Sequence, residues 1–156
     1  MIVKMKIGID IGGSHICIGV IDQNKIIDTV YTHINIDEIG DIEKFIYNNC
    51  VYGINKLLLR IHTTIDQIEK IGIAFPGKVK DNIVYNLPNL GIKQFNISKE
   101  LRKIFNTNII IQNDANCAAY AEKILGSMKE YSDFIFLCIG TGIGGAVIND
   151  NKLLTA

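Results

Sequence analysis

Several features that often assign a chain to a class are missing from this sequence. Its 16 basic and 16 acidic residues cancel to a formal net charge of +0, which excludes a general electrostatic attraction to nucleic acid or to an anionic membrane. No apolar run approaches the roughly 18 residues of a membrane-spanning helix, and no signal-peptide pattern opens the chain. The four cysteines form no C-x-x-C pair and have no histidine spaced with them for zinc. These absences predict a protein of the reducing cytoplasm, in which Cys17 and Cys138 are buried thiols inside apolar segments.

Two common phosphate-binding signatures are also missing. No G-x-x-x-x-G-K-[ST] segment occurs, so the chain has no P-loop lysine. Gly140, Gly142 and Gly145 do satisfy G-x-G-x-x-G, but the chain continues as strand, turn and strand instead of opening a helix. The dinucleotide-binding interpretation of these glycines therefore fails on its context. No Ser/His/Asp set for nucleophilic catalysis can be recognised either.

Alternating and continuous apolar segments predict most of the strands. With 156 residues, 48% of them hydrophobic, the chain is long enough for one ordinary domain with much buried strand. A short hairpin is expected around Asp81 and Asn82, because both residues favour turns. The other predicted strands cover residues 5–11, 15–21, 25–34, 71–75 and 109–112, and two more flank the glycines at residues 140–145.

Three helices are expected between these strands. Apolar residues recur at spacings of three and four from Ile42 to Ile65, which predicts a long amphipathic helix capped by Asp41 or Asp37. A short helix is expected from a cap at Ser98 to residue 105, and a third helix over residues 115–125. The order of strands and helices predicts a mixed sheet flanked by helices, which is an α/β architecture.

Two turns consist of almost bare backbone. Asp10-Ile-Gly-Gly-Ser14 follows the first strand, and a run of glycines joins the last two strands at residues 140–145. Backbone without side chains can approach a phosphate closely, and successive N–H groups can bind an anion. The Asp10 carboxylate would repel a phosphate unless a cation lay between them, and Mg²⁺ suits that position. The alternative is that Asp10 caps its turn, that Gly12 and Gly13 supply positive φ, and that neither turn binds a ligand.

A third polar pair lies where a buried strand meets a helix. Asn113 and Asp114 follow the strand at residues 109–112 and precede the helix at residues 115–125. Asp114 can be read as an N-cap of that helix. It can equally be read as a general base, because ligands of α/β proteins bind beyond the carboxyl ends of strands.

Taken in order, these segments resemble the ROK family of sugar kinases and sugar-responsive repressors. The two glycine hairpins with an Asp-led helix between them also resemble the duplicated phosphate loops of actin, hexokinase and heat-shock ATPases. The segments that carry the ROK resemblance are GIDIGGS (8–14), GIAFPGKV (72–79), NLPNL (86–90), QNDANCAAYAE (112–122) and GTGIGGA (140–146). The resemblance implies an actin/hexokinase-like (ribonuclease H-like) ATPase lobe. It also implies transfer of the γ-phosphate of ATP to a hydroxyl of a hexose or N-acetylhexosamine.

The resemblance implies a role for each matching residue. Asp10 would hold Mg²⁺, Asp114 would be the catalytic base, and Gly77, Asn113 and Asp114 would contact the sugar. The residues implied to contact ATP are Gly12, Gly13, Ser14 and His15 in the first turn, and Thr141, Gly142, Gly144 and Gly145 in the second. Ser14 stands where the family usually has Thr, and His15 stands where Lys or Asn is commoner. The resemblance leaves the sugar open among glucose, fructose, allose, N-acetylglucosamine and N-acetylmannosamine. It is also compatible with a homodimer.

Family members run to about twice this length. Residues 1–126 are therefore expected to form the N-terminal kinase lobe, with the first phosphate loop and Asp114. Residues 127–156 would begin a truncated second lobe that carries the second loop, and the 156-residue chain alone is expected to be inactive. One alternative is a sugar-responsive ROK regulator, but GIDIGGS begins at Gly8 and leaves no room before it for a DNA-binding helix-turn-helix. The other alternative is a non-catalytic remnant that binds nucleotide or sugar.

Overall fold

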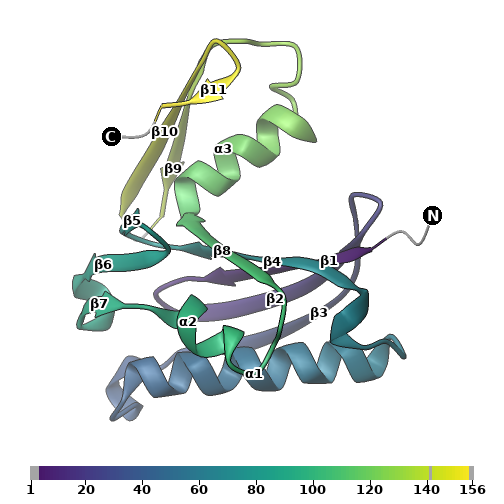
Figure 1. The fold of residues 1–156 in the computed structure, drawn as a ribbon. Coiled ribbons are helices and arrows are strands. Elements are labelled where there is room, and N and C mark those ends of the chain that lie inside the picture. The colour runs from purple at the N-terminus through teal and green to yellow at the C-terminus, as the bar shows by residue number, and fades with distance from the viewer. Residues whose placement is uncertain (1–3, 141, 155–156) are drawn as a thin grey trace. The chain divides into compact units, whose positions relative to one another are not determined.

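The computed structural model describes residues 4–140 and 142–154. The chain folds into two compact units, Met1–Gln112 and Asn113–Ala156. Figure 1 shows the ribbon of both units with its helices and strands labelled. The division of kinase lobes expected after residue 126 is a separate matter and stays a prediction. No helix within the described ranges is both long enough and apolar enough to span a membrane.

The first unit is built on a five-stranded mixed sheet, which confirms the predicted α/β architecture. The strand order is β3-β2-β1-β4-β8. β1 pairs antiparallel with β2 and parallel with β4, and β2 pairs antiparallel with β3. The bounds of the strands are β1 Met5–Ile11, β2 His15–Asp22, β3 Lys25–His33, β4 Ile68–Phe75 and β8 Asn108–Asn113.

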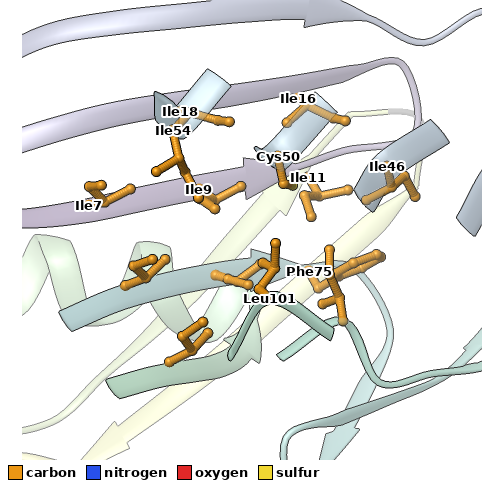
Figure 2. Close-up of a cluster of buried hydrophobic side chains, with 14 of the residues drawn as sticks. Ile7, Ile9, Ile11, Ile16, Ile18, Ile46, Cys50, Ile54, Phe75 and Leu101 are labelled. Atoms are coloured by element: carbon orange, nitrogen blue, oxygen red, sulfur yellow. The ribbon is translucent and has the colours of Figure 1, made fainter. Parts of the chain in front are cut away.

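One face of this sheet packs against helix α1, Ile42–Arg60. Successive side chains of a strand point to opposite faces, so Ile7, Ile9 and Ile11 of β1 are buried while Asp10 is exposed on the other face. Figure 2 shows the resulting core, in which Ile46, Cys50 and Ile54 of the helix lie next to isoleucines of β1 and β2. The hydrophobic effect therefore fixes which face of the sheet Asp10 occupies.

A small antiparallel sheet completes the first unit. It contains β5 (Lys78–Lys80), β6 (Ile83–Leu87) and β7 (Ile92–Phe95), in the order β5-β6-β7. Asp81 and Asn82 have φ values of 52° and 59°, as the predicted two-residue hairpin turn requires. The Asn82 Oδ1 atom accepts a hydrogen bond of 2.9 Å from the Ile111 N–H, which ties this turn to β8. The remaining elements of this unit are helix α2 (Ile97–Arg102) and the 3₁₀ helices η1 (Ile36–Glu38), η2 (Ile65–Gln67) and η3 (Pro88–Leu90).

The second unit is a helix packed against an antiparallel hairpin. Helix α3 (Asp114–Ile124) packs against β9 (Phe134–Ile139) and β10 (Ile143–Asn149), and β11 (Lys152–Leu153) pairs with β10. The Asp133 carboxylate, just before β9, accepts hydrogen bonds from the Asp150 N–H and from the Ser132 and Asn149 side chains. These bonds lower the pKa of Asp133 and hold the two ends of the hairpin together.

Several expected boundaries were wrong. The long helix ends at Arg60, because His62 has a φ of 52° and the Thr63 N–H returns to the Leu58 carbonyl, which closes the helix before Ile65. The short helix is capped by Asn96, whose Oδ1 accepts from the Lys99 N–H, and it ends at Arg102.

The remaining outcomes concern the side chains of Asp41, Ser98, Cys17 and Cys138, and one strand that was missed. Asp41 does cap α1, as one of the two predicted candidates. Ser98 lies buried inside α2 and does not cap it. The strand β7 was not predicted. The expectation that Cys138 is buried was wrong, since it lies beside the tip of the hairpin and is exposed, whereas Cys17 is half-buried.

Candidate functional site

The first glycine turn joins β1 to β2 and is closed at both ends. The Gly12 N–H donates to the His15 carbonyl at 2.8 Å, and the Ser14 carbonyl accepts from the Ile34 N–H at 2.8 Å. Asp10 lies two residues before the turn, opposite Cys17 of β2, and its side chain is 57% exposed. The turn is therefore a short stretch of backbone that lies between the Asp10 carboxylate and the start of β2.

Gly12 and Gly13 are glycine for different reasons. A Cβ at Gly12 would come within 2.8 Å of the His15 Cε1 atom, so the missing side chain makes room for the imidazole. A Cβ at Gly13 would meet no atom within 4 Å. Neither residue has positive φ, so that part of the alternative, ligand-free interpretation was wrong. Among the residues that the structure describes, the Gly13 and Ser14 backbone N–H groups donate no hydrogen bond.

The surroundings of Gly13 leave its backbone open to a ligand. The N–H groups of Gly13 and Ser14 have no acceptor among the described residues, and a side chain at Gly13 would meet no other atom within 4 Å. Such N–H groups can bind an anion, and an absent side chain lets it come close. The expected contacts of Gly12, Gly13, Ser14 and His15 with phosphate stay predictions.

Gly77 follows β4 and is glycine for the chain's own reasons. Its φ is +90°, which side-chain-bearing residues rarely adopt. A Cβ there would also come within 3.1 Å of the Tyr85 carbonyl oxygen and of the Leu87 side chain. Gly77 is thus required for the close approach of this turn to β6, and its contact with sugar stays a prediction.

The structure shows which of two neighbouring residues, Asn113 or Asp114, caps helix α3. The Asn113 Oδ1 atom accepts from the Asn116 N–H at 3.1 Å, so Asn113 is the N-cap of α3. Asp114 is the first residue of the helix, is exposed, and accepts a hydrogen bond of 2.8 Å from the Ala115 N–H through Oδ1. The cap interpretation of Asp114 was wrong, because its neighbour holds that position. The roles of both residues toward a substrate stay predictions.

The second glycine turn is shorter than expected. The Gly140 N–H donates to the Gly142 carbonyl at 2.9 Å, and a Cβ at either glycine would meet no atom within 4 Å. Thr141 lies outside the described residues. Gly144 and Gly145 belong to β10, where they pair with Cys138 and Leu137 of β9. The chain resumes its strand two residues before the last glycine of the run.

One charged group near the first turn, the Asp10 carboxylate, has the chemistry of a magnesium ligand. The described residues contain no group of three or more His, Cys, Asp or Glu side chains that could hold a metal by themselves. Mg²⁺ commonly uses only one or two carboxylates together with substrate phosphates and water. Asp10 offers one exposed carboxylate beside the turn. Burial and the charge of Asp10 raise the pKa of the Cys17 thiol, so Cys17 stays neutral near this carboxylate.

Sequence reasoning missed two aromatic side chains beside the turn. Tyr31 and His33 of β3 lie on the same face of the sheet as His15, because His33 pairs with His15 and Tyr31 pairs with Cys17. The turn at Gln23 and Asn24 could not have predicted this pairing, because the register of β2 and β3 shifts by one residue between Val20 and Ile21.

Comparison with known proteins identifies the family. Residues 6–156 match the model of the ROK family. The chain belongs to the ROK family. Among solved structures, a ROK family glucokinase from Streptomyces griseus, in complex with glucose and AMPPNP, matches with a TM-score of 0.82 at 27% identity. That match covers 96% of this chain and 46% of the other, and it confirms that the fold is that of the N-terminal portion of ROK proteins.

The curated relatives of this ROK protein include both kinases and repressors. The xylose repressor of Bacillus subtilis (strain 168) is 30% identical over 95% of this chain and 38% of its own length. The glucokinase of Streptomyces coelicolor is 30% identical over 96% of this chain and 45% of its own length. The chain thus spans less than half the length of these relatives, and sequence similarity does not favour one class over the other.

Proposed function

We propose that this ROK protein carries phosphate- and sugar-binding residues of an ATP-dependent sugar kinase. The proposed reaction transfers the γ-phosphate of ATP to a hydroxyl of a hexose or N-acetylhexosamine. The observation that supports it best is the turn at Gly13, where glycine serves no need of the fold and two N–H groups donate no bond to the described residues. The similar Streptomyces griseus glucokinase was solved with glucose and AMPPNP, which agrees with this proposal.

The proposed roles divide between the two units. In the first unit, the turn at Gly12–His15 would bind phosphate oxygens, Asp10 would hold Mg²⁺, and Gly77 would contact the sugar. Magnesium would supply neutralisation of the phosphate charge. In the second unit, phosphate oxygens would also be bound by the glycine turn and the start of β10, at Thr141, Gly142, Gly144 and Gly145. Asn113 would contact the sugar from the start of α3.

Asp114 would act as the general base of this reaction. The attacking sugar hydroxyl would give its proton to the Asp114 carboxylate while its oxygen bonds to the γ-phosphorus. The bond from the γ-phosphorus to the oxygen that bridges it to the β-phosphate would break, and ADP would leave. Asp114 is exposed and the N-cap position is occupied by Asn113, so the carboxylate is accessible to a substrate.

The substitution Asp114→Asn tests this function in the protein at its natural length. Asparagine keeps the shape of the side chain but cannot accept the proton, so turnover should fall by about 10²- to 10⁴-fold while sugar binding is retained. The measurements are ADP release over a panel of hexoses and sugar binding by calorimetry. Asp150→Asn removes the same charge from the exposed turn after β10 and should leave turnover unchanged. Undiminished turnover of Asp114→Asn would remove Asp114 from the mechanism.

A sugar-responsive regulator is the second candidate function. It is supported by the similarity to the xylose repressor of Bacillus subtilis, which is as strong as the similarity to the glucokinase and extends over 95% of this chain. A regulator of this kind would bind sugar without transferring phosphate. Sugar binding with no ADP release from any hexose of the panel would favour the regulator over the kinase.

A further inference from the structure

The imidazole of His15 is held on three sides. Its ring lies where a Cβ of Gly12 would be, with Cε1 at 2.8 Å and Nδ1 at 3.1 Å from that position. Its Nε2 atom is 3.4 Å from the Asp10 Oδ2 atom. On its remaining side it stacks on Tyr31, with ring centroids 5.5 Å apart and planes only 7° from parallel. Few rotamers of His15 are compatible with all three contacts.

Tyr31 owes its position to the register of β2 and β3. It pairs with Cys17 and so lies diagonally across from His15, within the reach of an aromatic side chain. It also contacts the ring of His33, which meets it edge-on with centroids 4.9 Å apart and planes at 74°. Tyr31 is 54% exposed and lies on the face away from the core that contains Ile18. Apolar burial alone is therefore a weak reason for an aromatic ring at this position.

The arrangement holds the His15 ring against Gly12, the residue just before the turn residues Gly13 and Ser14. The Nδ1 atom of His15 lies 3.1 Å from the position of a Cβ on Gly12. The two residues that follow Gly12 are Gly13 and Ser14, whose N–H groups donate no bond to the described residues. A side chain that is already ordered loses less freedom when a ligand binds, which strengthens binding. The Tyr31 ring restricts rotation of the His15 side chain by stacking on it. Gly12 has no side chain that could do the same.

We propose that Tyr31 is a positioning residue for the phosphate-binding turn, which acts by holding the His15 imidazole over Gly12. The inference rests on the proposed nucleotide-binding function of this turn. Tyr31 need not touch the nucleotide, and its effect on binding passes through His15. Its loss should weaken nucleotide binding by roughly 2- to 10-fold, the effect of one lost aromatic pair.

The test compares Tyr31→Ala and Tyr31→Phe with the wild-type chain. Binding of AMPPNP with Mg²⁺ is measured by calorimetry, and the imidazole signals of the three histidines are followed by NMR, with His15 assigned through His15→Gln. Phenylalanine keeps the stacked ring and should preserve both the upfield shift of the His15 signals and the affinity. Alanine should remove the shift and weaken binding. Tyr52→Ala, which truncates an exposed tyrosine of α1, should change neither.

Each outcome decides between distinct conclusions. If Tyr31→Ala binds AMPPNP as tightly as the wild type, Tyr31 has no positioning role, although the kinase proposal stands. If the chemical shifts of the His15 imidazole are the same with and without the Tyr31 ring, the stacking argument is wrong. If the wild-type chain binds no AMPPNP, the nucleotide function of the turn and the role of Tyr31 are both overturned. Should Tyr31→Ala fail to fold, Tyr31→Leu keeps the apolar bulk without an aromatic face, and the same expectations apply to it.

Discussion

The substitution Gly13→Val tests the first glycine turn at the position where folding and binding should separate most clearly. Valine adds a branched side chain between the two N–H groups that donate no bond to the described residues. The φ of Gly13 is not positive, and a Cβ there meets no atom within 4 Å. The new side chain would therefore project into the space that the proposed phosphate needs.

The expected magnitudes differ for the two properties. The free energy of unfolding should change by less than about 0.5 kcal/mol, as is usual for an exposed position without neighbours. A hydrogen bond to a charged group contributes about 1.5–3 kcal/mol. Preventing one N–H from reaching a phosphate oxygen should therefore weaken AMPPNP binding by roughly 10- to 150-fold.

The assay is calorimetric titration of the chain with AMPPNP and Mg²⁺, beside urea unfolding of the same samples. Gly40→Val is the matched control, because a Cβ at Gly40 also meets no atom within 4 Å in the first unit. The control should leave both affinity and stability unchanged. A Gly13→Val chain that folds and binds the nucleotide like the wild type would refute the assignment of this turn to phosphate.

Two further predictions concern stability. Gly77→Ala should lower the free energy of unfolding by about 1–3 kcal/mol, because the φ of +90° and the 3.1 Å approach to the Tyr85 carbonyl both disfavour a side chain. Gly72→Ala, where a Cβ meets no atom within 4 Å, should lower it far less. Equal urea midpoints for the two variants would contradict this. Burial raises the pKa of the Cys50 thiol from 9.0 to about 12, so above pH 9.0 the unfolded chain loses a proton that the folded chain keeps. Stability should therefore fall as the pH rises from 9.0 toward 12, by about 2 kcal/mol near pH ~10.5, and Cys50→Ala should remove this part of the slope. A Cys50→Ala chain with the wild-type slope would show that the thiol is not the cause.

Local patterns predicted most of the elements of the first unit. β1, β2 and β3 lie where the apolar segments predicted them, because β1 and β2 each bury one face in the core and β3 contributes Val30 to it. The end of α1 was missed because His62 adopts positive φ, which no apolar periodicity records. The cap of α3 went to Asn113 instead of Asp114 for a similar reason: both residue types cap helices well, and backbone geometry chose between them.

The sequence by itself determined the family, the mixed sheet and the places of both glycine turns, because period, turn residues and motif order are local properties of the chain. Only the tertiary structure distinguished Gly77, which is required by its φ and by the nearby β6, from Gly13, which the fold leaves open. Only the register of β2 and β3 brought Tyr31 against His15, residues sixteen positions apart by their numbers. What surrounds a residue depends on contacts between distant segments, and no local pattern encodes them.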